Sequence, residues 1–177
     1  MCGLNSSAST EAALLFSTGV LCYNSAGMTV TEFIAKWRRV ELTERSASQQ
    51  HFLDLCALVG QEPPAAADPD GTAFCFEKGA GKAGGGGGWA DVWKRGHFAW
   101  EYKGRAANLT SAYEQLLQYK DALDNPPLLV VSDMERFVIR TNFTNTPARR
   151  IEFTVDDLVD ERNLAVLRAV FFDPDRL

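Results

Sequence analysis

Residues 89–103 read WADVWKRGHFAWEYK, and their pattern predicts a β-hairpin. Apolar and polar residues alternate on both sides of Gly96, and a glycine between two such runs is typical of a tight turn. We expect one strand at Trp89–Lys94 and another at His97–Lys103.

The second strand of this hairpin separates apolar from charged side chains. Because successive side chains of a strand point to opposite faces, Glu101 and Lys103 share one face, while Phe98 and Trp100 share the other. The turn brings Asp91, on the first strand, close to Glu101. We therefore expect two carboxylates and a lysine to meet on the face opposite the aromatic rings.

Two neighbouring carboxylates repel each other and favour a bound cation. Oxygen ligands without Cys or His favour Mg²⁺ or Mn²⁺. Such an ion holds a phosphate and lowers the pKa of a bound water, as phosphodiester hydrolysis requires. Lys103 would orient the water and stabilise the oxyanion. From spacing alone, the alternative is a Glu-x-Lys strand that simply lies on an exposed face.

Around the hairpin, the periodicity of the apolar residues predicts a mixed α/β chain. A first helix, capped by Thr29 or Thr31, runs to about Val40. A second begins at Ser46, with Gln49 at the capping-box position, and stops at Gly60. Further helices are expected at 107–124 and from Thr154 or Asp156 to about Phe171, and further strands at Thr72–Lys78, Leu128–Val131, Phe137–Thr141 and Ile151–Thr154.

The helix at 107–124 would join two parallel strands of a central sheet. It connects the Glu101 strand to the continuous apolar run at Leu128–Val131, which is typical of a buried strand. The same helix carries Gln115 and Tyr119 at i and i+4, on one face. For this pair the alternative is a surface Gln and a half-buried Tyr on an ordinary amphipathic helix.

Seven glycines lie between Gly79 and Gly88, five of them consecutive at Gly84–Gly88. The pattern GxxxxGK[ST] is missing, which excludes a phosphate-binding P-loop. We expect a flexible turn or a DNA-contacting loop between strands.

The charge of the chain is unevenly distributed. The net charge is −5, which by itself argues against a dedicated nucleic-acid binder. Residues 78–105 nevertheless contain six basic and two acidic residues, so a basic surround for a polyanion is one interpretation and solvated loop lysines are the other.

The four cysteines show no CxxC pairing, which argues against a zinc site and is typical of a cytoplasmic protein. His51 and His97 are interpreted as surface or packing residues, and Asp54 and Asp133 as solvent-face or turn residues. Residues 1–27 contain no Lys or Arg and are expected to be a poorly ordered extension without a secretory signal.

Asp-x9-Glu-x-Lys followed by Gln-x-x-x-Tyr resembles the pattern of the PD-(D/E)xK nuclease superfamily, in its RecB-like branch. More closely, four stretches are similar to the N-terminal domain of MmeI-like restriction-modification enzymes, and together they place the resemblance over about Met28–Leu177. The stretches are Trp89–Lys94, Phe98–Gly104, Ala112–Tyr119 and Asn125–Asp133.

The resemblance implies a restriction-endonuclease-like fold, in which a mixed central sheet is flanked by helices, and a metal-dependent nuclease site. It makes Asp91 and Glu101 the ligands of Mg²⁺ (or Mn²⁺), with the main-chain carbonyl of Tyr102 as a third ligand. Lys103 becomes the catalytic lysine.

The resemblance also assigns supporting residues. Gln115 and Tyr119 would orient the site and contact the DNA backbone. An acidic or amide residue of the early helix often joins such sites, and Glu44, Gln49 and Gln50 are the candidates.

By the same resemblance, residues 28–177 form the endonuclease domain of a longer protein. Its adenine-specific methyltransferase, which uses S-adenosylmethionine, and its target-recognition domain would lie outside this chain, and double-stranded DNA would be the substrate. Two alternatives stay open: a catalytically idle DNA-positioning domain or truncated remnant, and a related repair or recombination nuclease.

Overall fold

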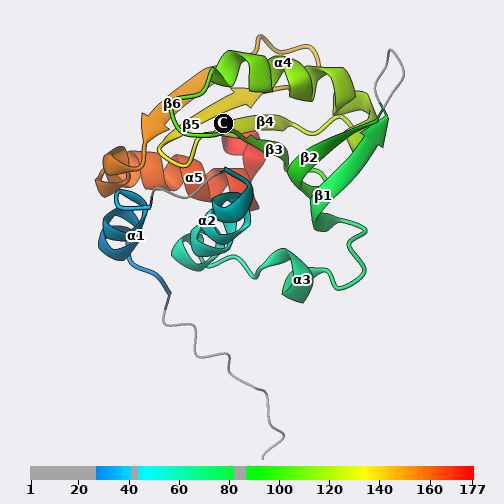
Figure 1. Cartoon of the computed structure of the whole chain (residues 1–177). Helices are drawn as coiled ribbons and strands as arrows, with labels where there is room; N and C mark the ends of the chain where they lie inside the picture. Colours follow the sequence, from blue (N-terminus) through cyan, green and yellow to red (C-terminus); the bar gives the residue numbers. More distant parts are fainter. Residues whose placement is uncertain (1–26, 41–43, 82–86) are drawn as a thin grey trace, which may run out of the picture.

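The computed structural model describes residues 27–40, 44–81 and 87–177, and its centre is a six-stranded sheet (Figure 1). The strands follow one another in sequence order across the sheet. They are β1 (Phe74–Gly81), β2 (Gly87–Lys94), β3 (Phe98–Tyr102), β4 (Leu128–Ser132), β5 (Arg136–Thr141) and β6 (Arg150–Thr154). The helices are α1 (Val30–Trp37), α2 (Glu44–Val59), α3 (Pro64–Ala67), α4 (Leu109–Tyr119) and α5 (Glu161–Phe172), with short 3-10 turns η1 (Lys120–Leu123), η2 (Asp156–Val159) and η3 (Pro174–Arg176).

Only one pair of neighbouring described strands is parallel. β3 and β4 run in the same direction, with Trp100 opposite Val130, and α4 is the connection between them. All the other pairs are antiparallel. The predicted parallel crossover is therefore confirmed. A parallel pair cannot be joined by a short turn, so the connection has to be long enough to hold a helix.

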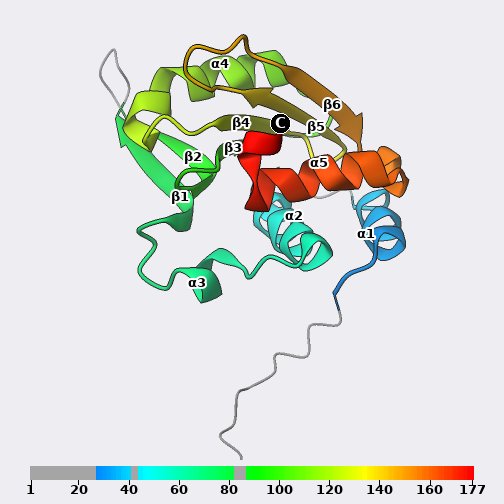
Figure 2. The ribbon, with the colours of Figure 1, turned by 180° about the vertical axis from the view of Figure 1, so that it is seen from behind.

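Helices cover both faces of the sheet, so the chain is mixed α/β, as predicted. α4 lies on one face, and α1, α2 and α5 lie on the other, in both views (Figures 1 and 2). The architecture is compatible with a restriction-endonuclease-like fold. No helix of the described residues has both the length and the apolar character needed to cross a bilayer.

The alternation within β3 divides the core into two parts, as the sequence predicted. Phe98, Trp100 and Tyr102 pack into the larger, aromatic cluster with α1, α2 and α5. Ala99 belongs to the smaller cluster under α4. Glu101 follows on the α4 side, so the charged face of the strand is separated from the aromatic one.

The helix boundaries depend on local capping. Thr29 and Glu32 form the complete capping box of α1, which confirms Thr29 as its N-cap, but the helix ends at Trp37. α2 already includes Glu44, so the predicted start at Ser46 is wrong. Gly60 follows the helix with φ +82°, as a C′ glycine does.

The start of α5 was also predicted wrongly. Its N-cap is Asp160, whose side chain accepts from the Arg162 N–H. Thr154 and Asp157 instead bond to each other's main-chain N–H at the 3-10 turn η2. The predicted N-terminal extension, residues 1–27, lies outside the described residues except for Gly27.

Two polar residues of the early helix are core residues. His51 is fully buried among aromatic rings, and its Nδ1 lies 2.8 Å from the Tyr102 hydroxyl, which confirms the packing interpretation. Asp54 was predicted on a solvent face, but it is 6% exposed. It accepts hydrogen bonds from Trp37 Nε1 and Gln50, so it joins α1 to α2.

Acid should destabilise this fold through His51. Burial lowers the pKa of His51 to about 3, whereas in the unfolded chain it stays near 6.5. The unfolded state therefore binds the proton more tightly, and the stabilisation present above pH 6.5 declines as the pH falls towards 3. We expect a loss of roughly 2 kcal/mol at pH 5, measured by urea unfolding at pH 7.5 and pH 5.

A His51→Gln variant cannot titrate, so its stability should change less between these two pH values. His97→Gln should keep most of the wild-type pH dependence, because His51 remains. An identical pH dependence in wild type and His51→Gln would contradict the assignment.

Candidate active site

Asp91 lies where the hydrogen-bonded register of β2 is interrupted on both sides. Against β1, Phe76 pairs with Val92 and Lys78 with Ala90, while the intervening Glu77 has φ +51°. Against β3, the pairing runs from Lys94 back to Val92 and stops there. β2 and β3 therefore diverge at Asp91, whereas the pairing of β2 with β1 resumes at Ala90.

The carboxylate of Asp91 bridges this divergence. Its Oδ2 accepts a hydrogen bond of 2.6 Å from the main-chain N–H of Tyr102. The Tyr102 side chain points the other way, into the aromatic core, where burial raises the pKa of its hydroxyl well above the usual value. Only the main chain of Tyr102 is therefore available at Asp91.

Glu101 and Lys103 meet on the α4 side of β3, as predicted. Glu101 is 4% exposed, and its Oε1 accepts from the Lys103 ammonium at 2.8 Å. The same oxygen accepts from Gln115 Nε2 at 2.8 Å, and Gln115 Oε1 lies 3.4 Å from Lys103 Nζ. The three side chains thus form a closed network between β3 and α4.

Tyr119 lies one helical turn after Gln115 and closes the same region. Its ring is 2% exposed, and its pKa is raised by burial first and by the negative charge of Glu101 second, while a hydrogen bond to Gln115 opposes the shift. The predicted pair at i and i+4 therefore faces the site together, rather than lying on an ordinary amphipathic surface.

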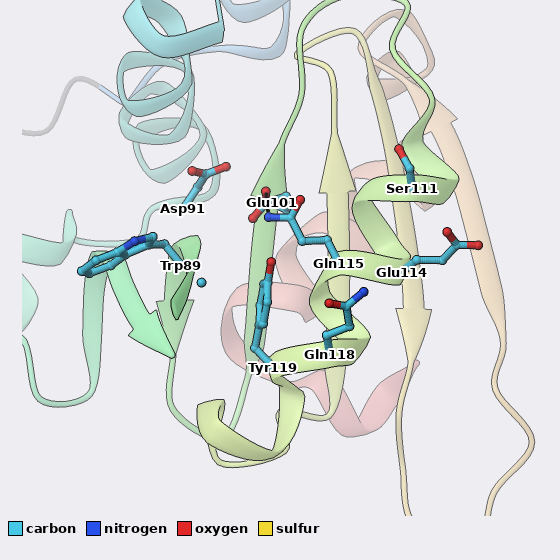
Figure 3. A pocket seen from close by; sticks show the side chains of 9 residues that line it. Trp89, Asp91, Glu101, Ser111, Glu114, Gln115, Gln118 and Tyr119 are labelled. Atoms are coloured by element: carbon cyan, nitrogen blue, oxygen red, sulfur yellow. Dashed lines mark hydrogen bonds between the residues drawn. The ribbon is translucent and has the colours of Figure 1, made fainter. Parts of the chain in front are cut away.

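A polar cavity of about 560 Å³ opens between the strands and α4 (Figure 3). Asp91 and Glu101 contribute from β2 and β3, and Gln115 and Tyr119 from α4. The remaining lining residues, which were not singled out from the sequence, are Gly88, Trp89, Ser111, Glu114 and Gln118.

A sequence signal for these helical residues did exist. Ser111, Gln115 and Gln118 repeat at intervals of four and three, so they mark one polar face of α4. Trp89, which is 62% exposed, had been assigned only to a strand. A large exposed ring at the edge of a polar cavity offers an apolar surface to a ligand.

A second cavity, of about 230 Å³, reaches Asp91 from the α2 side of the sheet. Gln49 is exposed and lines it together with Glu77 and Tyr102. Gln49 is therefore near Asp91 but outside the Glu101 cavity. Gln50 instead bonds to Asp54, away from both, and the side chain of Glu44 falls outside what is described.

Three basic residues of the described part of the 78–105 stretch bond elsewhere in the fold rather than at the site, contrary to one interpretation of its charge. Lys94 reaches the main-chain oxygen of Phe171, and Arg95 pairs with Asp124. Arg105 donates to the main-chain oxygen of Trp37. Lys103, by contrast, contacts the site residues Glu101 and Gln115.

The donor set of the cavity fits a hard divalent cation. Within the described ranges, no group of three or more His, Cys, Asp or Glu side chains is placed to hold a metal. Asp91 and Glu101 contribute two carboxylates to the lining of the cavity. Mg²⁺ is commonly held by one or two carboxylates, with water and substrate phosphate completing its shell.

Close packing between β2 and α4 fixes the depth of the cavity. A Cβ on Gly88 would lie 2.5 Å from Cε1 of Tyr119, closer than two carbon atoms can approach. We expect Gly88→Ala to lower the free energy of unfolding by about 1–3 kcal/mol, because the ring has to move. In a Tyr119→Ala background the same substitution should cost much less, which a double-mutant cycle of urea unfolding measures. An equal cost in both backgrounds would contradict this contact.

Comparison with known proteins identifies a domain family. A family model described as MmeI, N-terminal domain, matches residues 28–176. No curated protein and no solved structure matches the chain. Because the family model covers most of the sequence, the chain belongs to the MmeI N-terminal domain family, a domain of restriction-modification enzymes.

Proposed function

We propose that this chain is the endonuclease domain of a restriction-modification enzyme and hydrolyses phosphodiester bonds of duplex DNA with Mg²⁺. One observation carries the proposal. The Asp91 carboxylate is hydrogen-bonded to the main chain next to Glu101, and both acids line one cavity beside Lys103. Two carboxylates and an ammonium group in this arrangement suit metal-assisted attack on a phosphate.

Asp91 and Glu101 would hold the ion, with the Tyr102 carbonyl as a third ligand. When bound, Mg²⁺ neutralises charge on the phosphate and makes water a better nucleophile. Mn²⁺ has similar oxygen preferences and would substitute. The hydrogen bond from the Tyr102 N–H holds the Asp91 carboxylate beside β3, next to Glu101.

Lys103 would act as a charged hydrogen-bond donor rather than as a general base. Its ammonium group is already oriented by two acceptors, Glu101 and Gln115. A phosphate oxygen entering the cavity would replace one of them. The charge of Lys103 would then offset the negative charge that develops during in-line attack.

Gln115 would be a positioning residue. Its amide holds Glu101 through Nε2 and faces Lys103 through Oε1, so it sets the relative orientation of both. Tyr119 closes the cavity beside it. Both lie on α4, a helix firmly packed on the sheet, and a site on rigid elements keeps its geometry.

Partner domains would supply what the cavity lacks. Sequence recognition and adenine methylation with S-adenosylmethionine would belong to the target-recognition and methyltransferase domains of a full-length protein. The free thiols of the described residues Cys56 and Cys75 suit a reducing cytoplasm.

Substitution of the two acids should abolish cleavage. We expect Asp91→Asn and Glu101→Gln to reduce cutting of plasmid DNA to background when this domain replaces its counterpart in a full-length family member, because each removes a metal ligand. The matched controls are the exposed Asp70→Asn and Glu62→Gln, which should cut normally. Full cleavage by either site variant would reject the proposal and favour a catalytically idle, DNA-positioning domain.

Metal binding and cleavage should separate at Lys103. Lys103→Ala removes a charge but no metal ligand, so Mn²⁺ binding to the isolated chain, measured by electron paramagnetic resonance, should persist. Cleavage should fall by roughly 100- to 1,000-fold. The double variant Asp91→Ala/Glu101→Ala should bind no Mn²⁺. If Lys103→Ala cleaves like wild type, the lysine has no part in the chemistry.

A further inference from the structure

A separate cavity of about 150 Å³ lies where the start of α4 meets β5 and β6. Three arginines line it, Arg136, Arg140 and Arg150, against one carboxylate, Glu152. The arginines come from residues 136–150, outside the basic stretch that the sequence drew attention to. A concave surface with this excess of guanidinium groups favours an anion.

Two of the arginines already have partners inside the fold. Arg136 bonds to the buried Asp133 and to the main-chain oxygen of Ala107, and Arg150 pairs with Glu152. They supply positive charge, although Arg136 donates through Nε and Nη2, and Arg150 through Nη2, to partners within the fold.

Arg140 is different. Its guanidinium lies 4.3 Å from the ring centroid of Tyr113, and its Nε is enclosed without a hydrogen-bond partner among the described residues. Leaving a charged donor enclosed and unsatisfied is costly, whereas an acceptor in the cavity would complete it. A guanidinium packed over a ring has donors in one plane, which suits a phosphate.

The start of α4 contributes a second attraction for an anion. Leu109 and Thr110 begin an 11-residue helix, and Asn108 and Thr110 line the same cavity. The first turn of a helix carries a partial positive charge, which adds to that of the arginines.

The cavity and the active site share one face of the sheet. Val138 packs under α4, and Arg136 and Arg140 lie two residues on either side of it, so all three point to the α4 face. Arg140 is opposite Arg150 across β5 and β6. β5 and β6 lie two and three strands from β3, roughly 10–15 Å, which corresponds to about three or four base steps along one DNA strand.

We infer that the Arg140 cavity binds a backbone phosphate of the DNA duplex whose scissile bond enters the active site. This inference rests on the proposed function for its choice of ligand. The phosphate accepts from Arg140 and lies at the start of α4, so one strand is held a few nucleotides from the bond to be cut. Such a contact positions the duplex without reading its sequence.

The test uses Thr110→Glu, which brings a negative charge to the rim of the cavity and leaves Arg140 in place. Glutamate in a first turn favours the helix, so this variant should fold. Thr31→Glu is the matched control, because Thr31 is exposed and second in α1 as Thr110 is second in α4. Binding of a fluorescent 30-base-pair duplex is measured by anisotropy in EDTA at several salt concentrations, with Arg140→Gln alongside.

We expect Thr110→Glu and Arg140→Gln each to weaken binding by about 10-fold, and to make the slope of log K against log salt shallower by about one. Thr31→Glu should match wild type. Equal binding by Thr110→Glu and Thr31→Glu, or no duplex binding by wild type, would overturn the inference. Because EDTA removes the metal, this binding measurement does not depend on the outcome of the cleavage tests at Asp91 and Glu101. The two proposals can therefore fail independently of each other.

Discussion

The hydrogen bond from the Tyr102 main chain to the Asp91 carboxylate is the contact on which the site depends. Regular pairing between β2 and β3 would place an amide–carbonyl bond at this level, but the strands separate after Val92 and Trp100. The carboxylate satisfies an N–H that the divergence would otherwise leave unpaired, and a buried amide needs such a partner. The same divergence opens space beside Glu101. The divergence of β2 from β3 therefore accounts both for the end of their pairing and for the position of the Asp91 carboxylate.

The site is held from two directions. From the sheet, β3 fixes Glu101 and Lys103 through its parallel pairing with β4, where Lys103 N–H bonds to Ser132 O. From α4, Gln115 contacts both side chains, and Tyr119 packs directly on Gly88 of β2. Neither the sheet nor α4 forms the network of Glu101, Lys103 and Gln115 alone. The crossover from β3 through α4 to β4 brings these side chains together.

The sequence was a good guide wherever one strand or one turn decided the outcome. Alternation placed Phe98 and Trp100 opposite Glu101, and the hairpin turn put Asp91 at the matching level. It failed where several residues compete for the same role. Near α5, the cap was expected at Thr154 or Asp156, but Thr154 bonds to Asp157 at η2 and Asp160 caps the helix. Charge counting failed for a similar reason, since Lys94 is long enough to bond a carbonyl 77 residues away. The role of Gln115 in joining Glu101 to Lys103 required the fold, although its place on a polar helical face was visible.

The two faces of β3 have a consequence for how the protein tolerates change. Phe98, Trp100 and Tyr102 of this strand pack in the aromatic core, whereas Glu101 between them lines the candidate site. A point substitution affects one set and leaves the other. Insertion or deletion of a single residue in β3 would exchange the two faces, turning Glu101 and Lys103 into the aromatic core and the aromatic rings towards the cavity. Variation in this family should therefore be free in the length of its peripheral connections but fixed in the spacing between Asp91 and Lys103.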